Sequence, residues 1–427
     1  MTSIDWHQER ICIMYRYILR PIRENRSGTP LNDLSFYANF SIIHMHLKPE
    51  AIVPMPTNKK IFTAIAIAAL LFVSSGVSMA QVASTAVPFL QIEPDSRTAG
   101  MGNSGVALAD NATAIFWNPA GLAFQEGHEI NFTHADWLPN FGVDMFYDYL
   151  AGRYYVEGVG AIGAHITFLN LGEQEMRDEA NNLLGTFSSY EFAAGLSYGF
   201  KINNNFALGT GIRFIFSNLV PPGTEVSGQT ARNGTSVGVD IAALYRTNPF
   251  TVVGREAQLR AGFNLSNLGP SIQYTDEAQK DALPTLLRVG WAYNMNLDRN
   301  GFNTLTISND ISKIMARMED DGTGMSSLRA LVGSWDTLAR NDGTGVVQVP
   351  LLEQLMIGLG AEYWYDGLFA LRAGYFYESP NNGGREFITL GAGLRYNIFG
   401  VDFSYIYTLE EDHPLANTLR FSALLNF

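Results

Sequence analysis

The last eleven residues, Asn417 to Phe427, read NTLRFSALLNF and end the chain on an aromatic side chain. Apolar and polar residues alternate along this stretch, with Leu424 as an exception, and this is the period of a β-strand with one apolar face. An exposed apolar strand is an aggregation hazard in a soluble protein, but in a closed barrel within lipid it removes the free sheet edge. The stretch therefore predicts the closing strand of a transmembrane β-barrel.

A second signal lies nearer the start of the chain. Two lysines at 59–60 precede an uncharged apolar run over 61–73, and a small-x-small sequence follows at 78–80. We therefore expect 55–80 to be a secretory signal peptide that is cleaved. Such signals begin with only a few residues, so we expect 1–54 to be an over-called start without structure. A real cytoplasmic extension is the alternative.

Composition narrows the function classes. The chain has 28 Lys and Arg against 41 Asp and Glu, a net charge of -13, which disfavours nucleic acid as a partner. The one cysteine, Cys12, precedes the predicted signal, so we expect no disulfide in the mature chain. No apolar run of about 20 residues follows the signal, so we expect no helical membrane span. The remaining membrane architecture is a β-barrel.

From residue 127 onward the chain divides into fourteen segments of strand character, each about the length of a tilted membrane strand. They lie at 127–136, 142–154, 158–169, 186–200, 205–218, 234–247, 257–267, 284–296, 302–311, 353–365, 369–379, 385–398, 401–409 and 417–427. Followed back from the C-terminus, long connections alternate with short ones across the second half, as extracellular loops and periplasmic turns do in bacterial barrels. The alternation is less clean in the first half, where 248–256 is long for a periplasmic turn. The pattern predicts an all-β, 14-stranded antiparallel transmembrane barrel over 127–427, with both barrel ends at the periplasmic side.

Side-chain parity predicts two tight turns. Apolar residues fall on odd positions on both sides of 366–368, so this loop should have three residues with Gly or Asp in the left-handed region. They change from even to odd positions across Phe399-Gly400, which should be a two-residue turn. The opposite face predicts a polar lumen with ion pairs, formed by Glu362, Arg372, Glu378, Arg395, Asp402 and Ser404. A soluble β-sandwich, the alternative, does not account for the signal, the length and the terminal aromatic together.

Residues 81–126 lack strand character and are rich in small residues. They contain RTAGMGNSGVALAD at 97–110 and FWNPAGLA at 116–123. A fourteen-stranded barrel is too wide to be filled by its own side chains, so we predict that 81–126 forms a plug, or hatch, inside the lumen. Asn118-Pro119 would start a turn and Trp117 would anchor the plug to the barrel wall. The predicted plug residues are Gly100, Met101, Gly102, Trp117, Asn118, Pro119 and Gly121.

The two plug motifs resemble the N-terminal hatch of FadL-like outer-membrane proteins, and closely that of the PorV/PorQ family of Bacteroidota. GAEYWYDGLFALRAGY at 360–375 and HPLANTLRFSALLNF at 413–427 resemble the same family. The resemblance implies a non-enzymatic outer-membrane component of the type IX secretion system, with either the PorV or the PorQ role. Such a protein receives cargo through its C-terminal signal domain from the translocon barrel and passes it to a sortase-like surface protease. The resemblance also implies outer-membrane lipid around the barrel and a barrel-assembly signal at Phe427.

The long connection 312–352 is the first candidate for a partner surface. It holds more apolar residues than a solvated loop needs, and loops of this length tend to be functional or disordered. The candidate partner-binding residues are Met325, Leu328, Leu331, Trp335 and Leu338. A self-packed lid is the alternative, and the connections 268–283 and 410–416 come next as candidates.

Two other functions are alternatives. A FadL-type transporter of hydrophobic small molecules would use the same plug and strand count, with an apolar pocket beneath the outer loops. A lipid-modifying enzyme would need a Ser-His pair, but His165, expected to face the lumen, and His413, in an outer loop, accompany no nucleophile motif. GMGNSG lacks the Lys-Ser/Thr sequel of a phosphate loop, and the acidic residues at 320–321 and 410–412 fit no calcium loop. We therefore expect no enzyme activity, no cofactor and no metal.

Overall fold

The computed structural model describes most of the chain after the predicted signal. The described residues are 80–81, 85–141, 143–177, 182–226, 229–275, 280–319, 324–341, 346–410 and 413–427. The expectations for 1–54, and for the signal peptide up to residue 79, lie outside them.

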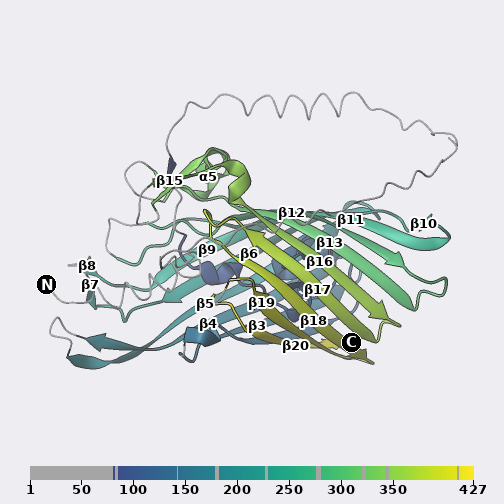
Figure 1. Cartoon of the computed structure of the whole chain (residues 1–427), viewed down its shortest axis with the longest axis horizontal. Coiled ribbons are helices and arrows are strands. Elements are labelled where there is room, and N and C mark those ends of the chain that lie inside the picture. The colour runs from purple at the N-terminus through teal and green to yellow at the C-terminus, as the bar shows by residue number, and fades with distance from the viewer. Residues whose placement is uncertain are drawn as a thin grey trace, which may run out of the picture. The chain divides into compact units, whose positions relative to one another are not determined.

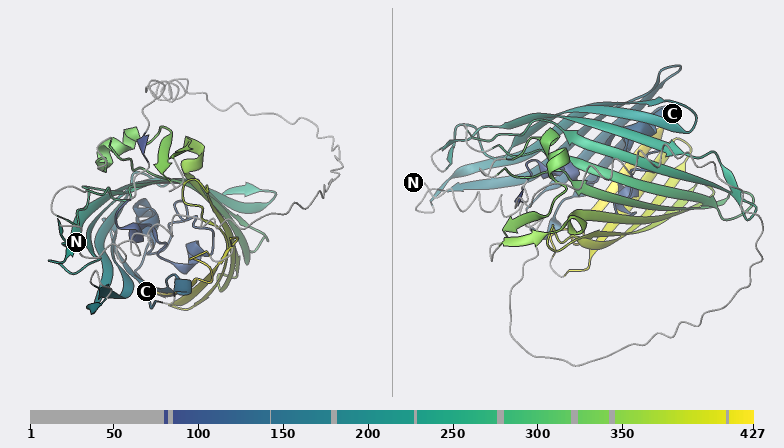
Figure 2. Two further views of the ribbon diagram at one scale, coloured as in Figure 1. Left: turned by 60° about the vertical axis from the view of Figure 1, so that its left-hand side comes forward. Right: turned by 90° about the horizontal axis from the view of Figure 1, so that it is seen from above.

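Fourteen antiparallel strands close into one barrel (Figures 1 and 2). They are β2 Glu129–Asp136, β3 Phe146–Val156, β4 Gly160–Arg177, β5 Leu183–Lys201, β6 Phe206–Asn218, β9 Gly234–Arg246, β11 Arg255–Leu268, β12 Leu286–Asn296, β13 Asn303–Ile314, β16 Leu355–Tyr365, β17 Phe369–Glu378, β18 Glu386–Tyr396, β19 Phe399–Thr408 and β20 Leu419–Asn426. Each pairs with the next, and β20 pairs with β2, so the ring has no free edge. The fifteenth strand of the sheet, β10 (Phe250–Val252), forms a short hairpin with β11. The predicted strand count is confirmed.

The remaining elements are short. β1 (Ala80–Gln81) lies parallel to β14 (Leu338–Asn341), which pairs with β15 (Val346–Val349), and β7 (Glu225–Val226) pairs with β8 (Gln229–Thr230). The helices are η1 Pro88–Gln91, α3 Ser96–Ala99, α4 Ala114–Trp117, η2 Pro119–Phe124, η3 Pro139–Phe141, α5 Ser327–Gly333 and η4 Leu351–Gln354. Within the ranges that the structure describes, none of these helices has the length and apolar character needed to cross a membrane.

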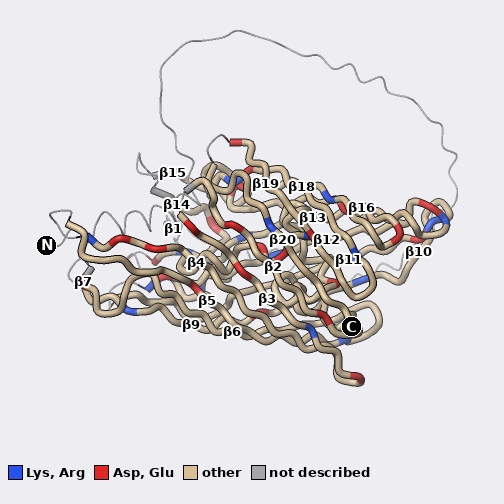
Figure 3. The backbone as a smooth tube through the Cα atoms, turned by 90° about the horizontal axis from the view of Figure 1, so that it is seen from below, with Lys and Arg blue, Asp and Glu red and all other residues tan. Residues whose placement is uncertain are grey.

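The alternation along β20 is the predicted one. Phe421 points outward and is 56% exposed, whereas Arg420 points inward and is 1% exposed. Leu424, the exception to the pattern, is buried on the inward face. The other strands follow the same rule, so the outside of the ring is largely apolar and charged residues are sparse along the strands (Figure 3).

The two ends of the barrel differ. One, which we call the short-turn end, holds the start of β2, the end of β20 and the connections 157–159, 202–205, 247–254, 297–302, 366–368 and 397–398. The other, the long-loop end, holds the connections 137–145, 178–182, 219–233, 269–285, 315–354, 379–385 and 409–418. Short and long connections alternate through the second half of the barrel. In the first half the eight-residue connection 247–254 at the short-turn end is longer than 178–182 at the long-loop end.

Of the two predicted tight turns, one lies at the predicted position and the other does not. Tyr365 pairs with Phe369, leaving a three-residue turn in which Asp366 and Gly367 have φ angles of 52° and 61°, as predicted. On the next hairpin Tyr396 pairs with Phe399, so the two-residue turn is 397–398 and the prediction of 399–400 is wrong. Parity fixes only the number of residues in a turn, and Asn397, with φ 54°, takes the left-handed conformation that Asn tolerates well.

β4 and β5 are longer than predicted, because pairing continues past an irregularity. The register shifts between Asn170 and Glu173, where Gly172 has φ 78°. Such a bulge interrupts the simple alternation, which is why the sequence pattern stopped at residue 169.

Candidate functional site: the segment inside the barrel

The N-terminal segment, residues 85–128, lies inside the ring of strands (Figure 2). It begins at the long-loop end, where the Ala86 amide donates to the carbonyl of Ala282 at 3.0 Å. It ends at the short-turn end, where the Ala112 amide donates to a carboxylate oxygen of Glu129 at 3.0 Å. Most side chains between these points are buried. We call residues 85–128 the luminal segment.

The luminal segment touches the wall backbone to backbone at Gly102. A Cβ on Gly102 would lie 2.4 Å from the carbonyl oxygen of Leu359 and 2.5 Å from that of Tyr375. The facing wall residues are also glycines: a Cβ on Gly374 would lie 2.0 Å from the Gly102 nitrogen, and one on Gly358 would lie 2.4 Å from its oxygen. With φ at +61°, Gly102 also adopts a conformation that side chains disfavour.

Two further contacts of this kind hold the segment. A Cβ on Gly199 would lie 2.6 Å from the carbonyl oxygen of Pro119, and one on Gly209 would lie 2.1 Å from the Ala120 nitrogen. Glycines on both surfaces thus let irregular backbone approach the strands closely, which larger residues would prevent.

The other residues of the predicted plug motif lie close by. A Cβ on Gly100 would lie 3.1 Å from the Gly391 Cα. Met101 is fully buried, and Gly121 packs on Ala109 within the segment. The structure therefore brings the two motifs together inside one compact unit.

Trp117 is held mainly by the luminal segment. Its indole N–H donates to Asp95 Oδ2 at 2.9 Å, and a Cβ on Gly105 would lie 2.3 Å from its ring. From the wall, the Arg288 guanidinium lies 5.2 Å from the ring. The polar wall contact comes instead from Asn118, whose side chain donates to the carbonyl of Ala243 on β9 at 3.0 Å.

Asn118 also organises the local fold. Its side chain accepts from the Ala120 amide at 3.1 Å, which caps η2, and Pro119 occupies the first turn of that helix. Its amide group donates to the carbonyl of Val106 at 2.8 Å. Asn at a helix N-cap followed by Pro is a favourable helix start.

Polar side chains of the wall satisfy the irregular backbone of the luminal segment. Asp310 accepts from the amides of Gly105 and Val106 at 2.8 and 2.9 Å. Thr389 accepts from the Gly102 amide at 2.9 Å. Because a buried backbone N–H without a partner is costly, these side chains fix the segment in one position.

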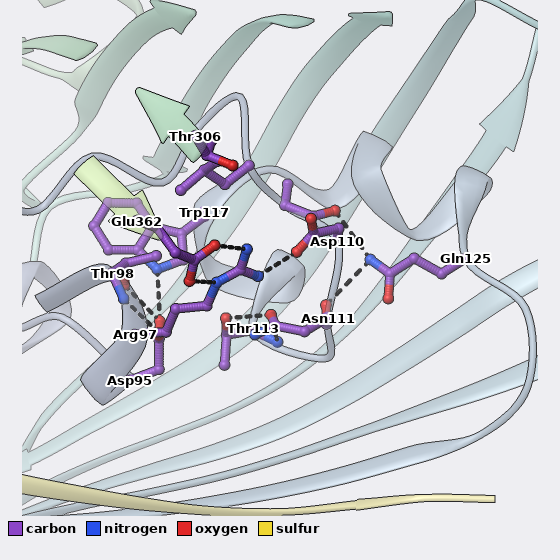
Figure 4. A network of polar contacts seen from close by, with 12 residues as sticks. Asp95, Arg97, Thr98, Asp110, Asn111, Thr113, Trp117, Gln125, Thr306 and Glu362 are labelled. Atoms are coloured by element: carbon purple, nitrogen blue, oxygen red, sulfur yellow. Dashed lines mark hydrogen bonds and ion pairs between the residues drawn. The ribbon is translucent and has the colours of Figure 1, made fainter. Parts of the chain in front are cut away.

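A chain of ion pairs, buried at its centre, links the segment to the wall, and Figure 4 shows its Asp110, Arg97 and Glu362. We call it the ionic chain, and it consists of Asp110, Arg97, Glu362, Arg372, Asp402 and Arg395. Arg97 forms a fork with both oxygens of Glu362, at 2.7 and 2.8 Å, and also pairs with Asp110. Burial lowers the pKa of Arg97, but Asp110 and Glu362 outweigh it and raise the pKa above its ordinary value. The predicted polar lumen with ion pairs is confirmed.

His165 and His413 are both buried. His165 points inward and stacks on Tyr149 at a ring distance of 5.7 Å. His413 lies in the β19–β20 connection, where its Nδ1 accepts from the Leu415 amide at 3.1 Å. Among the residues that the structure describes, no cluster of His, Cys, Asp and Glu is placed to hold a metal ion.

Beneath the long loops lies a small, mainly apolar cavity of about 40 Å³. It is lined by Pro88, Phe89, Gln91, Ile92, Glu93, Trp137, Leu138, Leu169, Leu171, Arg385, Phe387, Ile406 and Leu415. The luminal segment thus packs against several outer connections at once. His413, through its bond to the Leu415 amide, fixes one of them.

We expect the His413 connection to open in acid. Burial, and then the Arg385 guanidinium, lower the pKa of His413 to about 4 from an ordinary value of 6.5. Between these values the open loop binds a proton that the closed loop does not, so the closed loop loses stability as the pH falls from about 6.5 to about 4. Hydrogen-exchange protection of the Leu415 amide should fall roughly tenfold or more between pH 7 and pH 5.

His413→Asn supplies the matched variant. An Asn side chain accepts from the amide two residues on without titrating, so protection of Leu415 should no longer depend on pH. The Ile272 amide, bonded to Asp281 in another outer connection, should keep its protection in both proteins. An equal acid-induced loss in His413→Asn would show that another group is responsible.

The predicted partner residues have different surroundings. Met325 and Leu338 are buried, and Leu331 and Trp335 are partly buried, with the Trp335 indole donating to the Leu331 carbonyl at 2.7 Å. Leu328 on α5 is 69% exposed. Much of the connection is thus packed on itself. Its large exposed apolar residues are Leu328 and the neighbouring Val332 on α5, and Leu352 on η4.

Phe427 is exposed on the outer face of the short-turn end. Its backbone exchanges hydrogen bonds with His128, at 2.9 Å for its amide and 2.8 Å for its carbonyl. Its ring lies 5.7 Å from the His128 ring. The end of the chain is therefore paired, while the aromatic side chain stays accessible.

The sequence reasoning missed the role of Arg97. Glu362 and Arg372 were recognised as luminal, but their ionic partner lies 265 positions away from Glu362, in the luminal segment. The only local signal was a lone basic residue at the start of a motif of small residues.

The fold and the site define a class: closed antiparallel barrels that seat their own N-terminal segment in the lumen. A family model described as "Type IX secretion system protein PorV" matches residues 77–320. This is more than half of the chain, and the chain belongs to the PorV family. The match covers both plug motifs and ends before the two C-terminal segments that had suggested the family.

Several solved structures are similar to the chain. The P. putida toluene transporter TodX has a TM-score of 0.45 and 12% identity, with 79% of this chain and 98% of TodX covered. The CymD monoaromatic hydrocarbon channel has a TM-score of 0.44 and 14% identity, with 81% and 99% covered. A Pseudomonas aeruginosa FadL homologue has a TM-score of 0.39 and 13% identity, with 82% and 100% covered. No curated protein matches the chain.

Proposed function

We propose that the protein is a non-enzymatic outer-membrane component of the type IX secretion system. It receives cargo bearing a C-terminal signal domain from the translocon barrel and passes it to a sortase-like surface protease. The family match over 77–320 carries this proposal.

The outer face of the barrel supports the membrane location. Large apolar side chains such as Leu390, Val401 and Phe421 are more than half exposed to solvent along neighbouring strands. Soluble monomers rarely expose a continuous apolar surface of this extent, whereas lipid-facing strands require one. The short-turn end would face the periplasm and the long-loop end the outside.

The occupied lumen supports a role in transfer between partners. Gly102, Pro119 and Ala120 touch the wall backbone on different strands, so the luminal segment occupies space that a folded cargo domain would need. Cargo and partners would therefore use the long loops, where Leu328 and Val332 form an exposed apolar face on α5. Contacts with the translocon, the protease and the cargo domain remain part of the proposal.

A FadL-type transporter of hydrophobic small molecules is the second candidate, favoured by the apolar cavity beneath the long loops. The cavity volume is about 40 Å³, whereas a buried cavity that binds benzene has about 150 Å³. The loops or the luminal segment would have to move before an aromatic ligand could enter. This requirement makes transport the weaker candidate.

The experiment that tests the proposal is a pull-down of the tagged full-length protein from mild detergent, together with deletion of the gene. The secretion role predicts recovery of a very large barrel and a sortase-like protease, and periplasmic retention of proteins with the C-terminal signal domain. A transporter predicts normal secretion and loss of growth on one class of hydrophobic substrate. Recovery of neither partner, with secretion intact, would overturn the proposal.

We also propose Phe427 as the barrel-assembly signal. Phe427 is 64% exposed next to the closing strand, where an assembly factor can reach its aromatic ring. Deleting Phe427 should lower the amount of protein in the outer membrane several-fold, while protein that does assemble should still bind its partners. Immunoblots of membrane fractions measure the first effect, and normal levels of the truncated protein would contradict the proposal.

A further inference from the structure

Two arginines face each other inside the short-turn end of the barrel. Arg246, the last residue of β9, is the direct register partner of Arg260 on β11. Leu244 and Asn264, which belong to the same rows of side chains, are buried on the inward face. Like charges directly opposite each other destabilise a sheet, so this pair favours an anion between or beside the two guanidinium groups.

Arg260 already has a carboxylate partner within the protein. Its Nη1 donates to Asp110 Oδ2 at 3.0 Å and to the carbonyl of Leu108 at 3.1 Å. Asp110 also pairs with Arg97, so one carboxylate serves two guanidinium groups. Asp110 therefore cannot also neutralise a third guanidinium group, that of Arg246.

Arg246 has no such partner. Among the described residues, no carboxylate forms an ion pair with it. Its Nε lies 3.4 Å from the carbonyl of Asn204, and its guanidinium carbon lies 4.0 Å from the centre of the Phe124 ring. The ring holds the guanidinium plane in place, while the terminal nitrogens remain available to a ligand.

A cavity of about 250 Å³ lies beside the two arginines. It is lined by Leu108, Ala109, Asp110, Gly121, Phe124, Gln125, Glu126, Arg153, Leu244, Arg246 and Arg260. Two of these residues, Asp110 and Gln125, are labelled in Figure 4. Arg153 is paired with Glu129 at 3.1 Å, and Glu126 is exposed and forms no ion pair among the described residues. Arg246 is therefore the one cation of the described lining that no carboxylate contacts directly. Drug-sized ligands use cavities of about 300–1,000 Å³, so the occupant is small.

We propose that this cavity binds a small organic anion through Arg246, with Arg260 as the second donor. The oxyanion, a carboxylate or a phosphate, would accept from the guanidinium groups, which present their N–H groups in a fork that fits two oxygens. The apolar part of the ligand would lie against Phe124, Leu108 and Leu244. Neither the family match nor the proposed secretion role assigns a ligand to this place.

Calorimetric titration of the full-length protein in detergent micelles tests the proposal. Benzoate carries a carboxylate on an apolar ring, benzamide is its neutral counterpart, and inorganic phosphate is an oxyanion without the ring. Arg246→Gln removes the charge at the site, and Arg299→Gln removes an exposed charge in the 297–302 turn at the same end of the barrel. Arg246→Lys keeps the positive charge but removes the forked N–H groups of the guanidinium.

We expect the protein to bind benzoate and not benzamide, and Arg246→Gln to weaken benzoate binding about tenfold or more. Arg299→Gln should bind as the unchanged protein does, and Arg246→Lys should fall between. Phosphate binding that depends on Arg246 would support the oxyanion site. A weaker affinity for phosphate than for benzoate would measure the contribution of the apolar lining. Equal binding of benzoate and benzamide, or an unchanged affinity in a folded Arg246→Gln, would overturn the proposal.

Discussion

Replacing Gly102 by alanine is expected to unseat the luminal segment. The new Cβ would lie within 2.6 Å of three backbone atoms of Leu359 and Tyr375, none of which can move without disturbing β16 and β17. The left-handed conformation adds roughly 1–2 kcal/mol, and overpacking typically adds about 1–3 kcal/mol. Together they should lower the free energy of unfolding by roughly 2–5 kcal/mol.

Trypsin provides a direct readout of this change. Arg97 lies in the luminal segment with only 13% of its side chain exposed, so the seated segment should resist cleavage there. In Gly102→Ala, cleavage after Arg97 should appear while the barrel itself stays intact. Urea unfolding in micelles measures the accompanying loss of stability.

Gly185 on β5 gives the matched control. A Cβ at that position would have no atom within 4 Å, and the residue is exposed. Gly185→Ala should therefore leave both trypsin resistance and stability unchanged. If Gly102→Ala also stays resistant, the backbone contact at Gly102 does not hold the segment.

The barrel could be predicted from local signals, because lipid and lumen impose opposite preferences on successive residues of one strand. The C-terminal alternation from Leu419 to Phe427 is of this kind, and even Leu424 fell on the inward face that parity gave it. The positions of turns were harder to predict from the sequence. Parity gave the length of the connection after β18, two residues, but the left-handed conformation of Asn397 decided where it lies.

The seating of the luminal segment could be predicted only in outline. Small residues around Gly102 indicate a close approach of backbones, but nothing in the motif says that the facing residues are Gly358 and Gly374. The same holds for Arg97, whose partner Glu362 comes from a distant strand. Such pairs depend on where a compact segment sits in a closed ring, which is a property of the tertiary structure and not of any local period.

Loss of Glu362 is expected to have the other large effect. Its side chain is 1% exposed and neutralises Arg97 from the luminal segment and Arg372 from β17. Glu362→Ala leaves Arg97 to share Asp110 with Arg260, and Arg372 to share Asp402 with Arg395. Removing one member of a buried ionic group typically costs about 3–5 kcal/mol, because the remaining charges are then only partly compensated.

A double-mutant cycle separates seating from general destabilisation. Arg97→Met removes the charge that the luminal segment contributes, so Glu362→Ala should cost less in that background, with a coupling of roughly 0.5–3 kcal/mol. Glu319→Ala breaks an ion pair with Arg329, which is 70% exposed, and should cost less than about 1 kcal/mol. Urea unfolding of the four proteins of the cycle gives the coupling. A coupling near zero would mean that Glu362 stabilises the wall through Arg372 alone. The luminal segment would then be held in place by its glycine contacts.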